Sequence, residues 1–215
     1  MIRVVTIERE YGTGATRIAD ALALHLRWKL WDRDISAEIA RRLRCNPELV
    51  EQREERIDSM FYGLLKVFMR GSFEAQVETK GLELLDADHI AALFETVIEE
   101  IAEKGQCVIL GRGAPWFLRG REDTFHVFLY AAHEEKVRRI VAQGQSRRAA
   151  EGLVESVDRQ RLAFVRKYYG KEWPDRHLYN MMLNTGDGDE QVIETILERI
   201  EKTNSGGISR GGSPD

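Results

Sequence analysis

The first 32 residues contain the pattern that most restricts the fold. Val4 to Glu8 is a short β-branched run that predicts a strand, and the turn-prone segment Tyr11-Gly12-Thr13-Gly14 follows it. Apolar residues then recur at helical spacing over residues 16–26, and Leu30-Trp31 predicts a second strand. A strand, a glycine turn, a helix and a strand within about 30 residues make a βαβ unit. We therefore expect a parallel sheet.

The remaining sequence continues the alternation of strands and helices. Apolar runs predict three further strands, and periodic segments predict three further helices. The strands are expected over residues 107–110, 125–130 and 181–184, and the helices over 91–103, 133–143 and 190–202. Five strands alternating with helices predict a three-layer α/β/α sandwich with a five-stranded parallel sheet.

Composition and charge exclude several classes of protein. The 215 residues, 43% of them hydrophobic, suffice for a real core. A formal net charge of −4 gives no global basic field, so we expect no nucleic acid polymer as partner. The two cysteines, Cys45 and Cys107, argue against a disulfide scaffold or a zinc site. No stretch approaches the roughly 20 apolar residues of a membrane helix, and no signal-peptide layout occurs. We expect a cytoplasmic protein without a membrane partner.

Polar or glycine-rich segments follow three of the predicted strands. They are Glu8 to Gly14, Asp32 to Asp34, and Gly111 to Gly113. In open parallel sheets, ligands bind beyond the carboxyl ends of the strands. We therefore expect the three segments to converge on one cleft.

The first of these segments lies where a phosphate-binding loop belongs. Glycines allow backbone N–H groups to point into a shared concavity at a helix N-terminus. Against the pattern G-x-x-x-x-G-K-[ST], Gly14 and Thr16 match, whereas Arg9 replaces the first glycine and Ala15 replaces the lysine. A tight strand-to-helix turn explains the glycines equally well.

The other two segments also allow two interpretations. Arg112, between Gly111 and Gly113, offers a planar fork for a phosphate or carboxylate, but it could be an ordinary exposed turn residue. Asp32, before Arg33, could cap the next helix or contact a ribose, a base or a bound nucleophile.

A basic stretch lies between the fourth and fifth predicted strands. Arg159, Arg161 and Arg166 are among its cations, and acidic residues are interleaved with them. The stretch could be a solvated helix face. A lid over a polyphosphate would need the same residues, because cations must meet the charge on a transferred phosphoryl group.

Together these elements resemble the nucleoside monophosphate kinase group, specifically the cytidylate kinase-like family, over nearly the whole chain. The segment Glu8-Arg9-Glu10-Tyr11-Gly12-Thr13-Gly14 is similar to that family's R-E-Y-G-S-G loop. Further similarity lies in segments 30–34, 108–114 and 158–161, in Tyr168, Trp173 and Tyr179, and in Asn184-Thr185.

The resemblance implies a P-loop kinase-like domain over residues 1–204. Within it, residues 33–104 would form a helical monophosphate-binding insertion and residues 144–176 a lid, followed by a flexible tail over 205–215. It also implies transfer of the ATP γ-phosphoryl group to CMP or dCMP with Mg²⁺. For the donor phosphates the resemblance implies Gly12, Thr13, Gly14, Ala15, Thr16 and Arg17, with Thr16 as Mg²⁺ ligand. For the acceptor it implies Asp32, Arg33, Gly111, Arg112 and Gly113. For the transferring phosphate it implies Arg161, with Arg159 or Arg166.

The missing loop lysine leaves alternatives open. The family often lacks this lysine, and the sequence here reads Ala15-Thr16-Arg17 where Gly-Arg-Glu is common. We hypothesise that Arg9 or Arg17 supplies the charge at the β- and γ-phosphates, and we favour Arg9. The alternatives are a kinase for another small acceptor and a catalytically silent nucleotide-binding or regulatory protein. We expect a monomer or homodimer.

Overall fold

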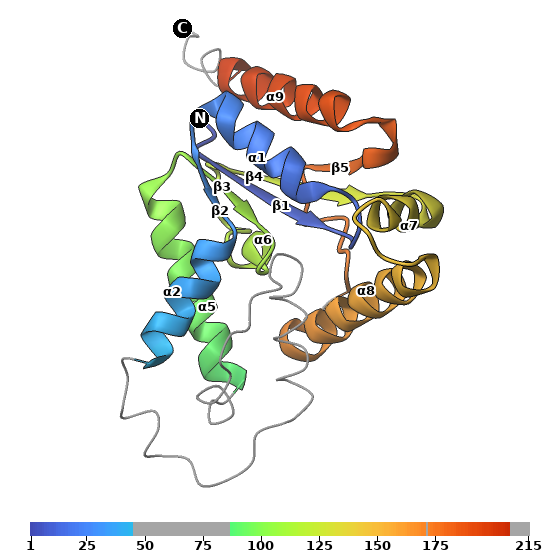
Figure 1. Cartoon of the computed structure of the whole chain (residues 1–215). Coiled ribbons are helices and arrows are strands. Elements are labelled where there is room, and N and C mark those ends of the chain that lie inside the picture. The colour runs from blue at the N-terminus through green and yellow to red at the C-terminus, as the bar shows by residue number, and fades with distance from the viewer. Residues whose placement is uncertain (45–86, 171, 207–215) are drawn as a thin grey trace, which may run out of the picture.

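The computed structural model describes residues 1–44, 87–170 and 172–206 (Figure 1). Strands and helices alternate along these ranges, as the sequence predicts. In chain order they are β1 (Val4–Arg9), α1 (Ala15–Leu26), β2 (Lys29–Trp31), α2 (Arg33–Arg44), α5 (Ala87–Lys104), β3 (Cys107–Leu110), α6 (Ala114–Phe117), β4 (Thr124–Tyr130), α7 (His133–Val141), α8 (Arg147–Tyr169), β5 (Met181–Asn184), the 3₁₀ helix η2 (Thr185–Asp187) and α9 (Asp189–Gly206).

The five predicted strands form one sheet with the order β2-β3-β1-β4-β5. All four pairings between neighbouring strands are parallel; Val4 of β1, for example, pairs with Cys107 of β3 and with Thr124 of β4. The three strands with polar or glycine-rich ends, β2, β3 and β1, are neighbours in this order. Their carboxyl ends therefore meet at one edge of the sheet.

Helices cover both faces of the sheet, which confirms the three-layer architecture (Figure 1). On one face α1 and α9 enclose a core cluster that includes Ile18, Leu22 and Ile196. On the other face α2, α5 and α6 enclose a second cluster that includes Ile35, Ile98 and Trp116. Among the residues that the structure describes, no helix has the length and apolarity required to cross a membrane.

The helices differ from their predicted bounds at the ends. The helices predicted over 91–103 and 133–143 are α5 and α7, and the one predicted over 190–202 is α9, which extends to Gly206. Helix α9 thus enters the predicted tail, whose residues 207–215 lie outside the described residues. The predicted insertion begins with α2 and ends with α5, and residues 45–86 between them are likewise outside the described part.

A buried histidine joins the two central strands. His126 of β4 lies opposite Thr6 of β1, and Thr6 Oγ1 is 2.7 Å from His126 Nδ1. The residue is 6% exposed. Burial lowers the pKa of His126 to about 4, although a hydrogen bond to the Leu118 backbone opposes the shift. The imidazole is therefore neutral at pH 7.

We expect His126 to make the fold sensitive to acid. Its pKa is about 4 in the folded chain and 6.5 for the ordinary group, so the unfolded state binds more protons between these values. Unfolding is therefore favoured as the pH falls, by about 2 kcal/mol between pH 7 and pH 5. Urea denaturation at both pH values measures the loss. The His126→Asn variant keeps a partner for Thr6 and should show a smaller dependence; equal dependence in both proteins would contradict the assignment.

Candidate active site

The turn between β1 and α1 contains two glycines with left-handed backbone angles. Gly12 has a φ of +82°, and Gly14, the N-cap of α1, has a φ of +77°. A Cβ on Gly12 would lie 3.1 Å from the Lys136 Cβ and 3.0 Å from the Ile140 Cδ1, so α7 packs closely on this loop. Both the backbone angle and the approach of α7 therefore favour glycine at position 12.

Arg139 of α7 holds this loop in place with a side chain that is 13% exposed. Its guanidinium donates to the carbonyl oxygen of Thr13 at 2.6 Å and to that of Thr185 at 2.7 Å. It also pairs with Glu135 at 2.7 Å and with Asp189 at 3.1 Å. One cation thus joins the glycine loop to α7 and to the connection between β5 and α9.

The residues after the second glycine point in different directions. Ala15 is buried at the start of α1, whereas Thr16 is exposed. The Arg17 side chain is 71% exposed and pairs with Asp189 at 2.9 Å. Arg17 is therefore directed toward α9, and the first turn of α1 leaves Thr16 accessible beside the positive end of the helix dipole.

Three arginines from three elements are buried beyond the ends of β1 and β3. Arg9 ends β1, Arg112 follows β3 and Arg161 lies on α8; their side chains are 7%, 1% and 3% exposed. Arg112 Nη2 donates to Asp32 Oδ1 at 3.2 Å, and Arg161 Nη1 donates to the Arg9 carbonyl oxygen at 2.8 Å. A Cβ on Gly111 would overlap Arg9 Nη1 and lie 3.0 Å from its Cζ. The structure thus brings together these five residues, all of them predicted.

The turn that carries Arg112 has an unusual backbone. Gly111, Arg112 and Gly113 have φ values of +70°, +66° and +70°. A positive φ is uncommon for a residue other than glycine, and residues held in such conformations cluster at active sites and ligand clamps. The strained turn directs the Arg112 guanidinium to Asp32 in the interior.

The three arginines repel one another. Burial lowers the pKa of Arg112 to about 10, and the charge of Arg9 contributes while Asp32 opposes the shift. Burial lowers the pKa of Arg161 to about 10 as well, again with a contribution from Arg9. Both groups stay cationic at neutral pH. An anion with several oxygens bound here would be favoured by charge and by hydrogen bonding.

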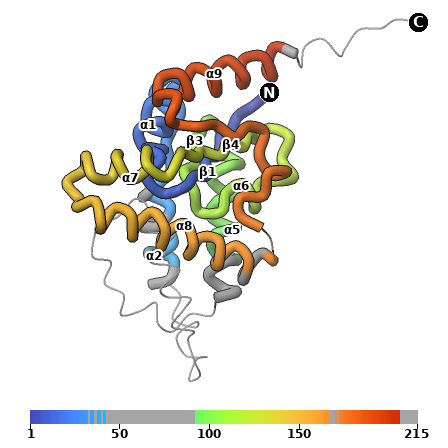
Figure 2. Tube along the Cα trace, turned by 90° about the vertical axis from the view of Figure 1, so that its right-hand side faces the viewer, coloured from blue at the N-terminus to red at the C-terminus, as the bar shows by residue number. Residues whose placement is uncertain are grey.

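A partly buried carboxylate, that of Asp158 on α8, joins this helix to the glycine loop. Asp158 Oδ1 accepts from the Tyr11 backbone N–H at 2.8 Å, and Asp158 Oδ2 accepts from Lys136 Nζ at 3.3 Å. Lys136 also donates to Glu10 Oε2 at 2.8 Å, and Arg161 pairs with Asp158 at 3.4 Å. Figure 2 shows α7 and α8 side by side next to the loop. This network holds Arg161 against the loop.

Three predicted site residues do not join this cluster. Arg159 is 75% exposed and pairs with Glu155 at 3.8 Å, and the Arg166 side chain is 66% exposed. Because residues two positions apart do not share a helix face, Arg159 is directed away from Arg161. Arg33 begins α2, and its side chain lies outside the described part of the structure.

Sequence reasoning did not select Glu8, Lys136 or Arg139 as site residues. Lys136 and Arg139 lie three positions apart on α7, and this spacing could have placed both on one helix face next to the loop. Glu8 ends the predicted first strand and begins the polar segment 8–14, but nothing in the sequence distinguishes it as a site residue. Its side chain is 6% exposed and lies 3.7 Å from Arg9 Nη1.

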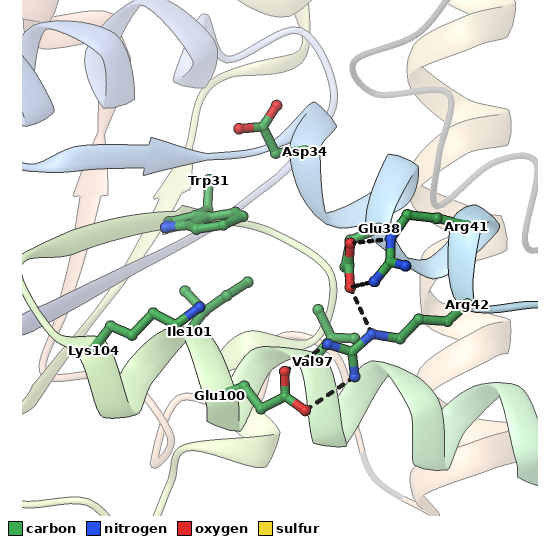
Figure 3. Close-up of a pocket in the computed structure, with 9 residues that line it drawn as sticks. All are labelled: Trp31, Asp34, Glu38, Arg41, Arg42, Val97, Glu100, Ile101 and Lys104. Carbon is green, nitrogen blue, oxygen red and sulfur yellow. Dashed lines mark hydrogen bonds and ion pairs between the residues drawn. The ribbon is translucent and has the colours of Figure 1, made fainter. Parts of the chain in front are cut away.

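A second hollow lies between α2 and α5, next to the carboxyl end of β2 (Figure 3). This groove of about 410 Å³ is lined by Trp31, Asp34, Glu38, Arg41, Arg42, Val97, Glu100, Ile101 and Lys104. Its charges pair among themselves, because Arg42 contacts Glu38 at 2.7 Å and Glu100 at 2.6 Å. The groove therefore offers a bound anion less uncompensated charge than the arginine cluster does.

Other reactive groups are few in the described residues. These residues contain no group of three or more His, Cys, Asp or Glu side chains that could hold a metal ion. Burial raises the pKa of the Cys107 thiol to about 11, so this thiol is protonated at neutral pH. Cys107 therefore lacks the thiolate that a nucleophile needs.

Comparison with known proteins identifies one family and one fold. The model of the cytidylate kinase-like family matches residues 4–187. No curated protein matches the sequence.

Solved structures with the same architecture cover nearly the whole chain. A protein from Eubacterium ventriosum ATCC 27560 has a TM-score of 0.67 and 20% identity, covering 94% of this chain and 99% of its own. Shikimate kinase from Bacteroides thetaiotaomicron has a TM-score of 0.51 and 15% identity, with coverage of 94% and 99%. Shikimate kinase from Acinetobacter baumannii, in complex with shikimate, has a TM-score of 0.51 and 17% identity, with coverage of 94% and 95%. The fold is that of P-loop kinases.

Proposed function

Because this chain belongs to the cytidylate kinase-like family, we propose that it transfers the γ-phosphoryl group of ATP to a nucleoside monophosphate, CMP or dCMP, and forms the diphosphate. Family membership supports the coarser statement directly: the chain is a phosphotransferase for a nucleotide or another small molecule. The observation that carries the proposal is the burial of Arg9, Arg112 and Arg161 where the strands of a P-loop kinase fold end.

Each part of the site has a role in this proposal. The loop from Gly12 to Thr16 would hold the donor phosphates at the N-terminus of α1. Arg17 would join them only by leaving Asp189, with which it pairs in this structure. Asp32, Arg33 and the turn Gly111–Gly113 would face the acceptor. Thr16, which is exposed at the loop, would be the protein ligand of Mg²⁺.

This Mg²⁺ ligand set suits a nucleotide-bound ion. Mg²⁺ keeps several waters and is commonly held by substrate phosphates with few protein ligands. The described residues offer no dedicated cage of carboxylates, which agrees with that mode. When bound, the ion would neutralise charge on the donor phosphates.

For this reaction the protein must mainly align the two substrates and provide positive charge. In phosphoryl transfer, most of the catalysis comes from two effects. The protein aligns the attacking oxygen with the bond that breaks, and it stabilises the negative charge on the oxygens of the transferring phosphoryl group. Arg161 is buried and held by Asp158, so in our proposal it is the arginine of α8 that lies between the acceptor phosphate and the transferring group. Arg159 and Arg166 could take part only if α8 moved relative to the arrangement described. Cytoplasmic location and a monomeric or dimeric state remain predictions.

A direct product assay tests the proposal. The protein is incubated with Mg-ATP and CMP, dCMP, UMP, AMP, GMP, shikimate or no acceptor, and products are separated by ion-exchange chromatography. We expect diphosphate from CMP or dCMP and none without acceptor. Product formed only from another acceptor would favour the alternative of a kinase for another small acceptor. ATP binding without product from any acceptor would favour the silent nucleotide-binding protein, a reading motivated by Ala15 at the lysine position.

A further inference from the structure

Arg9 has fewer hydrogen-bond partners than the other two buried arginines. Arg112 has Asp32 at 3.2 Å, and Arg161 has the Arg9 carbonyl oxygen at 2.8 Å. Arg9 forms an ion pair with Glu8, whose Oε1 lies 3.7 Å from Nη1, and this distance is too long for a hydrogen bond. Within the described part of the chain, Arg9 Nη2 is buried with no hydrogen-bond partner.

The place of the Arg9 guanidinium separates it from the donor loop. The guanidinium lies over Gly111. Gly111 follows β3 and directly precedes Arg112 in the chain. The glycine loop packs on the opposite side, against Lys136 and Ile140 of α7, which follows β4. Since β3 and β4 flank β1 on different sides, Arg9 is directed away from α7 and toward the turn proposed for the acceptor. This geometry disfavours our first hypothesis, in which Arg9 serves the donor phosphates.

A buried guanidinium with unused donors needs an anionic partner. Burying a polar group without a hydrogen bond is costly, and Glu8 balances the charge of Arg9 in an ion pair at 3.7 Å without accepting a hydrogen bond from it. Arg9 also repels Arg112 and Arg161, whose pKa values its charge lowers. A phosphomonoester dianion has two charges and three terminal oxygens, enough to accept from three guanidiniums at once.

We propose that Arg9 binds the phosphate of the acceptor together with Arg112 and Arg161, and that this third guanidinium restricts the enzyme to acceptors that already carry a phosphomonoester. The inference rests on the proposed function and adds a specificity-determining residue to it. Neutral acceptors of the same shape, such as nucleosides, leave the buried Nη2 of Arg9 without a hydrogen-bond acceptor and are rejected. Arg9 contributes nothing to the donor phosphates.

Isothermal titration calorimetry of matched variants tests this assignment. CMP, cytidine, orthophosphate and ATP are titrated into the parent protein and into Arg9→Gln, Arg9→Lys and Arg138→Gln. Arg138 is the control, because its side chain is 74% exposed on α7. We expect Arg9→Gln to weaken CMP binding by about 10- to 100-fold, as for loss of charged hydrogen bonds. Cytidine and ATP should change by less than about twofold, and Arg9→Lys should be intermediate because it keeps the charge but not the fork.

Several outcomes would overturn the assignment. CMP affinity that is the same in Arg9→Gln and Arg138→Gln, or a loss confined to ATP, would remove Arg9 from the acceptor site. If Arg9→Gln does not fold, arginine side-chain ¹⁵N spectra of the unaltered protein replace it. Orthophosphate must then shift the guanidinium signal of Arg9, assigned from the Arg9→Lys spectrum, and an unchanged signal would contradict the proposal.

The same data separate this inference from the proposed function. Orthophosphate binding that depends on Arg9, without phosphorylation of any nucleoside monophosphate, would refute the nucleotide kinase and support the phosphate site. Normal CMP phosphorylation with an unchanged CMP KM in Arg9→Gln would support the kinase and refute the role of Arg9.

Discussion

Replacing Asp158 by alanine is expected to lower the free energy of unfolding by about 3–5 kcal/mol, the usual result of removing one partner from a buried ion pair. The carboxylate accepts from the Tyr11 backbone N–H at 2.8 Å and from Lys136 Nζ at 3.3 Å, and it lies 3.4 Å from Arg161 Nη1. Its side chain is 18% exposed, so water replaces little of what is lost.

The loss arises in the partners of Asp158 more than in the carboxylate itself. Burial raises the pKa of Asp158, although Arg161 and the Tyr11 N–H oppose the shift, so the charged carboxylate gains little from its site. After truncation, however, Arg161 is a buried cation without its acid, and the Tyr11 N–H loses its acceptor. An unsatisfied buried donor alone costs about 1–3 kcal/mol.

Urea denaturation at pH 7 measures this effect. Asp20→Ala, at an exposed position of α1, is the matched control and should change stability by less than about 0.5 kcal/mol. Asp158→Asn keeps an oxygen for the Tyr11 N–H but not the charge, so it should fall between the two. A loss for Asp158→Ala no larger than that of the control would show that α8 is not held to the loop by this carboxylate.

Gly111→Ala should lower kcat/KM for phosphoryl transfer by about 100-fold, a loss expected when a charged hydrogen-bond donor leaves a site. Its stability should fall by only about 1–2 kcal/mol, the cost of a left-handed conformation for an L-residue. The added Cβ would overlap Arg9 Nη1 and lie 3.0 Å from Arg9 Cζ. Because Arg9 is the end of a long side chain, it moves, and the arginine cluster is disrupted without unfolding the core.

Two further glycines separate the backbone effect from the displacement of Arg9. Gly170 has a φ of +62°, close to the +70° of Gly111, and no atom would lie within 4 Å of an added Cβ. Gly170→Ala should therefore match the stability loss of Gly111→Ala. Gly120→Ala, also in open space, should keep kcat/KM within about twofold. Parent-like kcat/KM in Gly111→Ala would mean that Arg9 does not act in the site.

The strands could be predicted closely because each is a short apolar run with clear limits. The runs at 107–110 and 181–184 are β3 and β5 without change, and β1 extends one residue beyond Glu8. Gly105 and Gly111, both with positive φ, stand on either side of β3. Glycine tolerates that angle with no steric cost, so it marks the ends of regular structure in the sequence.

The site was predictable where strand ends define it. Arg112 and Asp32 follow neighbouring parallel strands, so topology alone places their backbones at one edge of the sheet. On α8 the helical period could also have separated Arg161 from Arg159, and it could have paired Arg161 with Asp158 three positions earlier. Position along an element therefore predicts which of these residues lie close together.

The direction of Arg9 could not be predicted in the same way. Its backbone ends β1 next to the glycine loop, which suggested a role there, but several rotatable bonds separate the backbone from the guanidinium. The head group lies over Gly111 because a glycine from another strand leaves room for it. The direction of this side chain depends on contacts between residues about 100 positions apart, so a local sequence pattern cannot predict it.

The order of the sheet also has a consequence for synthesis of the chain. Strand β1, which precedes the other four strands of the sheet in the chain, is the central one, and both of its neighbours, β3 and β4, are synthesised about 100 residues or more later. At about 5–20 residues per second, β1 waits roughly 5–20 s before its first partner exists. During that interval Val4, Val5 and Ile7, which are buried in the finished fold, expose their apolar side chains, and both edges of the strand are unpaired. A nascent-chain chaperone is the expected protector of this strand, and slow translation through residues 10–106 would lengthen its exposure.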